Sequence, residues 1–284
     1  MKTVNSLSGG KTSSYIAVKY PADYNIFSLV RTNDKNCLFP DAKIRQIVSD
    51  KIGVEFIGTL EEDMIIYTML DLEQFIGRKI EWLTGKTFDE IINRNGKMYL
   101  PNVTQRFCTT EMKLQPIFNW WKKTINEPVI MRIGFRANEM KRAKTMLEKT
   151  NEKGILEFRD IIGKSKNGTR NKWGNIEWQK PEFPLINDAI FKDTIENYWK
   201  DKPVRFAYMN NCVGCFHRNE ILLKYMSEKH PNKFQWFCDQ ENKGGYGKRS
   251  FKNGMTYDKI KKWKTQLELF DDDFNDCDSG YCGL

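Results

Sequence analysis

Two stretches of this sequence carry residues whose types and spacing could do chemistry, and the first lies near its start. Ser8-Gly9-Gly10-Lys11-Thr12-Ser13 follows a short alternating run, and residues 13–19 are compatible with a helix. Glycines at a strand-to-helix turn allow backbone N–H groups to converge on an anion, and the helix N-terminus adds partial positive charge. The lysine and the hydroxyl groups of the loop supply further donors. The stretch therefore predicts a phosphate or pyrophosphate site, although a plain Gly-Gly turn has the same glycines.

The second stretch is Cys212-Val213-Gly214-Cys215, whose Cys-x-x-Cys spacing serves redox pairs, zinc sites and iron–sulfur clusters. The sequence holds seven cysteines, an odd number for a disulfide scaffold, in a chain too long to need one. It has no second Cys-x-x-Cys and only two histidines, so we expect neither a zinc ribbon nor a histidine-rich site. Thiolate ligation or thiol chemistry is the expectation. The other cysteines are scattered: Cys37, Cys108, Cys238, Cys277 and Cys282.

Basic residues gather in two further places. Arg136 and Arg142 follow an apolar run at 128–135 and suit a second anion, the ribose–phosphate part of the same ligand, or a solvated helix surface. Residues 163–180 are rich in Lys, Gly, Asn and Trp without periodicity, which predicts a mobile basic loop. Its tryptophans, Trp173 and Trp178, could stack on bases or anchor the loop.

The composition narrows the class of protein. The 284 residues are 40% hydrophobic and include eight Trp and eighteen Phe, as expected of a globular chain with a substantial core. Basic residues exceed acidic ones by nine, which favours an anionic partner: a nucleotide, or a nucleic acid such as tRNA or DNA. No apolar run approaches about 18 residues and no signal sequence is evident, so we expect a cytoplasmic protein without membrane contact.

The apolar pattern predicts the elements that position these residues. Strands are expected at the run before the glycine loop and at 23–32, 54–58 and 128–135, and helices at 42–51, 61–76 and 192–200. Residues 80–92 read as a turn followed by a helix, and Pro116 is expected to separate two helices. Alternating strands and helices imply parallel pairing with right-handed crossovers. The glycine loop should then lie at the carboxyl end of the first strand, where open parallel sheets bind ligands.

Together these stretches resemble the phosphoadenosine phosphosulfate (PAPS) reductase family of the PP-loop, adenine nucleotide alpha-hydrolase-like superfamily, above all its orphan and phage-borne members. Residues 8–13 are similar to the Ser-Gly-Gly-x-Asp-Ser loop of that superfamily, with Thr12 at the acidic position, whereas only the tail of a Walker A loop is present. The other motifs that carry the resemblance are Arg106-Phe107-Cys108-Thr109 with Lys113 and Pro116, Gly134-Phe135-Arg136 with Glu139 and Arg142, and Cys212-x-x-Cys215.

The resemblance implies ligands and cofactors. Cluster-bearing reductases of the family place a Cys-Cys pair ahead of Lys-x-x-Pro and a Cys-x-x-Cys later, which puts Cys108, Cys212 and Cys215 in register for a [4Fe–4S] cluster, with zinc as the alternative. Thr109 takes the second position of the pair, so the fourth ligand is Cys238 or a tail cysteine, or the iron stays open, as in some PP-loop enzymes that thiolate tRNA. The nucleotide, ATP or PAPS with or without Mg²⁺, would contact residues 8–13, Gly134, Arg136 and Arg142.

The resemblance also bears on the C-terminus. Reductases of the family end in a mobile tail whose Glu-Cys-Gly-Leu-His cysteine attacks the sulfur of the bound nucleotide. Cys282-Gly283-Leu284 is similar to the core of that motif, with Tyr281 in place of the glutamate and without the histidine. Cys282 is therefore the candidate nucleophile, with a thiol reductant protein as its partner; a frayed terminus or a structural ligand pair is the alternative.

We therefore expect an α/β, three-layer sandwich around a mostly parallel, Rossmann-like sheet at residues 1–205, followed by a smaller, helical and loop-rich part with cysteines at 206–284. The expected function is PAPS reductase-like action at the phosphate or sulfate end of an adenine nucleotide. One alternative is an ATP-dependent enzyme that inserts sulfur into tRNA or DNA, and another is a nucleotide-binding protein without turnover. Thr12 in place of a carboxylate favours a role other than ATP hydrolysis.

Overall fold

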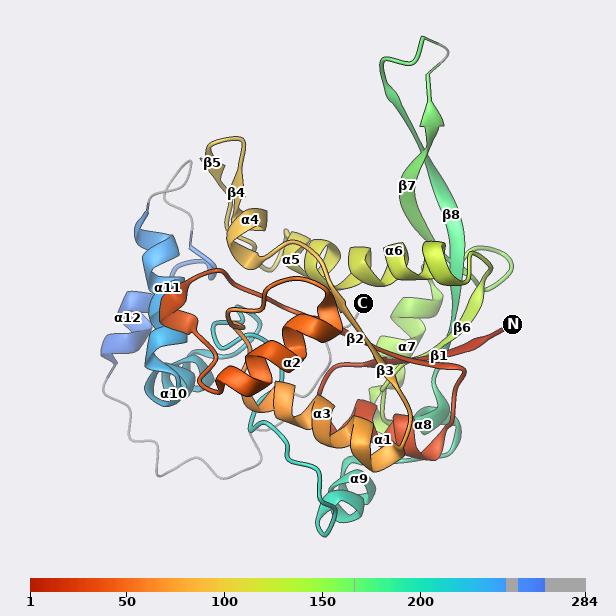
Figure 1. Ribbon diagram of the computed structural model, residues 1–284, viewed down its shortest axis with the longest axis horizontal. Coiled ribbons are helices and arrows are strands. Elements are labelled where there is room, and N and C mark those ends of the chain that lie inside the picture. The colour runs from red at the N-terminus through yellow and green to blue at the C-terminus, as the bar shows by residue number, and fades with distance from the viewer. Residues whose placement is uncertain (166, 244–249, 264–284) are drawn as a thin grey trace.

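The chain forms an α/β fold around one six-stranded sheet in the computed structural model, which describes residues 1–165, 167–243 and 250–263 (Figure 1). The strand order is β3-β2-β1-β6-β8-β7, and all neighbours are parallel except the β7–β8 pair. Helices pack on both faces, so the predicted three-layer, mostly parallel fold is confirmed. The strands are β1 (Thr3–Leu7), β2 (Tyr24–Leu29), β3 (Ile80–Thr84), β6 (Val129–Arg132), β7 (Leu156–Lys164) and β8 (Asn171–Glu182).

Alternate residues of the strands feed two cores, one on each face of the sheet. Val4 and Ile26 belong to a cluster with α6 and α7, whereas Leu7 and Phe27 belong to a cluster with α1, α2, α3, α8 and α9. This period of two is the pattern of a strand buried on both sides. The first layer contains α1 (Lys11–Lys19), α2 (Ala42–Ile52), α3 (Met64–Ile76), α8 (Pro184–Asn187) and α9 (Lys192–Trp199), and the second contains α6 (Gln115–Thr124) and α7 (Met140–Leu147).

The topology creates a switch point between β1 and β6. From β1 the chain builds outward through β2 to β3, and it then returns to place β6 on the other side of β1. Loops that leave the carboxyl ends of two such strands diverge, and open α/β sheets bind ligands in the crevice between them. The glycine loop after β1 and the segment after β6 flank this crevice.

The C-terminal helices share a core with the N-terminal half. Val30, Leu60 and Phe88 lie in one buried cluster with residues of α10 (Glu220–Lys229), α11 (Pro231–Asn242) and α12 (Tyr257–Lys262). Val30 directly follows β2, so this cluster packs against the carboxyl end of the sheet. The short helix α4 (Phe88–Ile92), which starts with a capping box from Thr87 and Glu90, belongs to the same cluster.

Two predicted elements are wrong. Residues 54–58 make only isolated bridges through Gly58 and do not join the sheet. The parallel strand next to β2 is instead β3, which lies within the stretch predicted as a turn and helix.

Pro116 does not separate two helices, because a π-helical turn η2 (Thr110–Leu114) links α5 (Phe107–Thr109) to α6 without a break. Pro116 has no N–H for the carbonyl of Met112, and Ser28 Oγ donates a hydrogen bond to that oxygen at 2.9 Å.

Residues 156–182 replace the predicted loop with a long antiparallel arm made of β7 and β8 (Figure 1). Trp178, near the sheet end of the arm, is buried and stacks edge-on against Phe118 and Trp121 of α6. Trp173, near the tip, is 53% exposed. The two tryptophans that the sequence grouped together thus have different environments. No helix within the described ranges is long and apolar enough to cross a lipid bilayer.

Candidate active site

The glycine loop has the geometry of an anion cradle. Gly9 adopts φ +79°, a left-handed conformation that L side chains rarely adopt, and Gly10 is the N-cap of α1. Ser13 Oγ accepts a hydrogen bond from the Ser8 N–H at 3.1 Å and donates one to the Gly10 carbonyl at 3.1 Å, so the serine closes the loop on itself. The first turn of a helix leaves its N–H groups without partners inside the helix, and those of α1 open toward this loop.

Three contacts at glycines show how closely other segments approach the loop. A Cβ on Gly9 would lie 2.6 Å from Ile65 Cγ2, and a Cβ on Gly10 would lie 2.3 Å from Asn210 Nδ2. A Cβ on Gly134, just past β6, would lie 3.3 Å from Thr12 Cγ2. The predicted neighbours Gly134 and residues 8–13 are therefore together at the switch point.

Cations surround the loop, but acidic partners balance them. Lys11 forms an ion pair with Glu196 of α9, and Trp199 Nε1 donates to the Lys11 carbonyl at 2.9 Å. Arg136 is almost fully buried and pairs with Glu139 at 3.1 Å, and Arg142 pairs with the other oxygen of the same carboxylate. The two arginines and one glutamate carry a net charge of +1 beside Gly134, and this residual charge suits an anionic ligand.

The three cysteines predicted as ligands line one cavity. Cys108 comes from α5, and Cys212 and Cys215 come from the loop before α10. The space open to the centre of a water-sized sphere is about 20 Å³, roughly the room that one water molecule requires. The other residues that line the cavity are Phe88, Arg106, Thr109, Gly214, Phe216, His217, Phe237 and Phe251.

The cysteine loop is held by buried contacts with its backbone. The Arg218 guanidinium, 1% exposed, donates from Nη2 to three consecutive carbonyls, those of residues 210, 211 and 212, at 2.7, 3.3 and 3.2 Å. Tyr257 Oη donates to the Gly214 carbonyl at 3.0 Å, and a Cβ on Gly214 would lie 2.5 Å from the ring of Phe237. Glycine at this position lets the loop pass against the aromatic core.

The donor set of the cavity fits a thiolate-bound metal in chemistry but not yet in geometry. Three cysteines in a mostly apolar cavity are typical ligands for zinc or iron–sulfur clusters. As placed, no three Cys, His, Asp or Glu side chains of the described residues are close enough to hold an ion. Burial, with Arg106 and Lys252 nearby, lowers the pKa of His217 to about 4, so its ring is neutral at pH 7. A space of about 20 Å³ has room for a single ion, whereas a cluster would also require the loops to move apart.

Cys238 lies elsewhere in the described structure. It is fully buried in α11, does not line the cavity with the other three, and hydrogen-bonds to Asp258. Burial, together with that acidic partner, raises the pKa of its thiol to about 12. Cys277 and the candidate nucleophile Cys282 lie outside the described residues.

The cysteine cavity and the glycine loop are joined by one short segment. Asn210, whose side chain lies against Gly10, is two residues from Cys212, which spans at most about 7 Å of chain. The Val213 N–H donates to the Leu60 carbonyl at 2.7 Å, and the backbones of Glu61 and Cys212 form an isolated antiparallel β-bridge. A thiolate-bound group would therefore lie close to a ligand on the loop.

Sequence reasoning missed a buried charged network beside this segment. Glu61, 2% exposed, pairs with Lys113 at 3.0 Å, while Glu62 accepts from the Met209 N–H at 2.6 Å and lies 3.2 Å from His230 Nε2. The run Glu61-Glu62-Asp63 looks like an exposed acidic surface in sequence, and only its position after the short apolar stretch 54–60 hints at burial.

No protein-family model, curated protein or solved structure matches the chain.

Proposed function

We propose that this protein is a PP-loop enzyme that binds an adenine nucleotide through residues 8–13 and acts at its phosphate or sulfate end. The observation that carries the proposal is the loop itself: a left-handed Gly9 and the N-terminus of α1, at the switch point of a parallel sheet. Backbone N–H groups of the first turn of α1 would bind the anion, and Gly10 and Gly134 let Asn210 and Thr12 pack closely around the loop.

In this proposal each residue has a distinct role. Lys11 exchanges Glu196 for a phosphate, and Arg136 and Arg142 neutralise the more distant phosphate or sulfate while Glu139 keeps them oriented. Cys108, Cys212 and Cys215 would hold the metal centre, and Arg218 keeps two of them in place through the loop backbone. A zinc ion or iron–sulfur cluster at these thiolates would supply positive charge or redox capacity beside the nucleotide.

A second function, sulfur insertion into a nucleic-acid base, is favoured by a specific observation. Among the described residues, three cysteines line the cavity and Cys238 does not. A metal held by these three thiolates alone would keep one coordination position for an exogenous sulfur. Under this alternative the nucleotide is ATP and activates the target. Under the first it is PAPS: Cys282 would take the sulfo group as adenosine 3′,5′-bisphosphate leaves, and a thiol reductant protein would supply the second thiol that releases sulfite as a disulfide forms.

Calorimetric titration with ATP, PAPS and adenosine 3′,5′-bisphosphate tests the proposal. Gly10→Val should abolish binding, because the branched side chain displaces Asn210 and fills the space beside the N–H groups of the loop. Gly163→Val, in open space on the arm, is the matched control. Lys11→Ala should weaken binding by about tenfold or more, as expected for a lost charged hydrogen bond. Lys19→Ala, at the other end of the same helix, should leave nucleotide binding unchanged. Unchanged affinity in folded Gly10 and Lys11 variants would contradict the proposal.

A further inference from the structure

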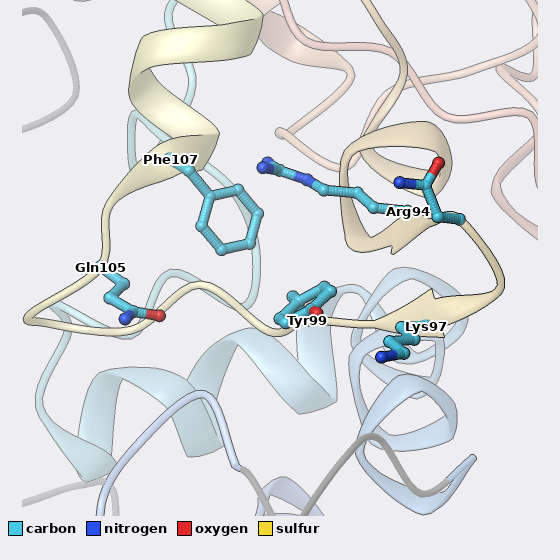
Figure 2. Close-up of a pocket in the computed structure, with 6 residues that line it drawn as sticks. Arg94, Lys97, Tyr99, Gln105 and Phe107 are labelled. Carbon is cyan, nitrogen blue, oxygen red and sulfur yellow. The ribbon is translucent and has the colours of Figure 1, made fainter.

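A second concave site lies outside the glycine loop and the cysteine cavity (Figure 2). It is an open pocket of about 460 Å³, a size common for sites that bind small organic ligands. In Figure 2 the side chains of Arg94, Tyr99 and Phe107 converge on its centre, with Gln105 and Lys97 at its edges. Asn95 completes the lining that the structure describes.

The pocket is built by a tight β-hairpin. Strands β4 (Asn93–Arg94) and β5 (Lys97–Met98) are joined by Asn95 and Gly96, both with positive φ, at +51° and +71°. Asn-Gly with two left-handed residues is the preferred two-residue hairpin turn. The turn fixes the direction of both flanking side chains, so the pocket is formed by a defined backbone.

The hairpin places two cations directly opposite each other. Arg94 and Lys97 are cross-strand partners in the ladder, and like charges in such a pair are destabilising. Arg94 gains compensation from Glu111, with which it forms an ion pair, and from the Phe107 ring, 4.4 Å from its Cζ. The pair brings two positive charges to one edge of the pocket, which suits an anionic ligand.

Phe107 also connects this pocket to the cysteine cavity. It lines the pocket, while its neighbours Arg106 and Cys108 line the cavity on the other side of the same turn. The pocket and the cysteine cavity are therefore lined by adjacent residues of one segment, 106–108.

We propose that this pocket binds a nucleotide unit, an aromatic base with its phosphate. Tyr99 and Phe107 are half-buried rings on which a base can stack, and Arg94 and Lys97 suit a phosphate. Asn95 and Gln105 supply amide donors and acceptors for a base edge. The assignment goes beyond the proposed function and does not depend on adenine nucleotide binding at the glycine loop.

The nucleotide unit can be free or part of a strand, and the arrangement favours a strand. The β4–β5 hairpin and the β7–β8 arm project on the same side of the molecule, with α6 between them (Figure 1). The arm carries exposed basic residues and the exposed Trp173, so the same face offers charge and a stacking surface along an extended path.

Binding of a fluorescein-labelled single-stranded oligonucleotide and of free CMP and UMP tests the assignment. Tyr99→Ala should weaken binding by about tenfold through lost stacking, and Tyr99→Phe should retain it. Lys97→Glu should weaken binding by about tenfold or more, and it places a carboxylate opposite Arg94. The stability of that variant should therefore be unchanged or raised, so lost binding cannot be attributed to unfolding. Lys200→Glu, the same charge change at the end of α9, is the control.

The outcomes separate the two sources of the ligand. Loss of both oligonucleotide and mononucleotide binding supports a site for the nucleotide unit itself, and loss of oligonucleotide binding alone assigns the pocket to a strand. If folded Tyr99 and Lys97 variants bind both probes as the unmodified protein does, or if neither probe binds the unmodified protein, the inference is overturned. Pyrimidine probes keep the result independent of adenine nucleotide binding at the glycine loop.

Discussion

At the scale of single residues, Gly214 shows how tightly the cysteine loop packs. An alanine there would place its Cβ 2.5 Å from the Phe237 ring, which is itself buried among other aromatic rings. We expect Gly214→Ala to lower the free energy of unfolding by about 1–3 kcal/mol, as is usual when a packed core is overfilled. Urea denaturation measures this, with Gly163→Ala as the control in open space. Equal stability of the two variants would show that the loop can move away from the ring.

Two buried thiols lead to a prediction about pH. Burial, with Asp34 beside Cys37 and Asp258 beside Cys238, raises the pKa of each thiol to about 12. An acid whose pKa is raised stays protonated until the pH approaches that value, so both residues are thiols, not thiolates, from neutral pH to about pH 10.

Iodoacetamide reacts with thiolates, so it should leave Cys37 and Cys238 unmodified in the folded protein at pH 8 and modify both in urea. Mass spectrometry of peptides from native and unfolded samples measures the difference. Rapid modification of Cys238 in the native protein would mean that its thiol is ionised or that α11 opens readily.

At the scale of elements, the β7–β8 arm carries exposed basic residues that could contact nucleic acid. Lys164, Arg170 and Lys172 are exposed near its tip, and Lys122 of α6 pairs with Asp160 of β7 at 2.8 Å to hold the arm against the body. The nucleic-acid contact predicted from the sequence stays a prediction, but the element that would make it is now a two-stranded ribbon instead of a loop.

Replacing Lys164, Arg170 and Lys172 by Gln should weaken oligonucleotide binding and flatten its salt dependence. Each lost phosphate contact on a single strand should reduce the slope of log K against log salt by about 0.7. Fluorescence anisotropy over a range of NaCl concentrations measures the slope. The matched triple replacement on α7 and just beyond it (Lys141, Lys144 and Lys149) should leave the slope unchanged. An unchanged slope in the arm variant would exclude the arm from binding.

At the scale of the whole molecule, the cysteine site depends on two distant parts of the chain. Cys108 follows the β4–β5 hairpin, and Cys212 and Cys215 precede α10. The shared core of Val30, Leu60, Phe88 and the C-terminal helices brings these segments together. Metal binding should therefore stabilise the fold as a unit, because the ligands meet only when both parts are packed.

Protein purified without oxygen should contain metal at this site. A [4Fe–4S] cluster makes it brown and binds iron and sulfide, whereas zinc leaves it colourless with one ion per chain. Replacing Cys108, Cys212 or Cys215 by Ala should remove the metal, and Cys238→Ala should not, because Cys238 lies outside the cavity. Elemental analysis decides. Full metal content in the Cys108 variant would contradict the assignment.

Local signals in the sequence were enough for much of the sheet and for the glycine loop. Apolar runs bounded by local turn and helix-end residues predicted β2, β6, α2 and α3. Gly53, for example, ends α2 in the left-handed conformation expected of a helix C-cap. The geometry of the glycine loop was predictable because its glycines, its serines and the following helix are adjacent in the chain, whereas its binding of phosphate stays a prediction. The Asn95-Gly96 hairpin also carried a readable local signal, which the sequence reading did not use.

Tertiary contacts settled the rest. The stretches 54–58 and 80–84 are both short and apolar, and the choice of β3 depended on which could pair with β2, a partner more than fifty residues away. Cys108 meets Cys212 and Cys215 because segments about one hundred residues apart pack together. The same packing leaves Cys238 outside the cavity. Glu61 and Glu62 are buried only because Lys113, His230 and the Met209 N–H meet them there. Such partners leave no trace in local spacing, since the free energy that places them comes from burial and pairing across the whole fold.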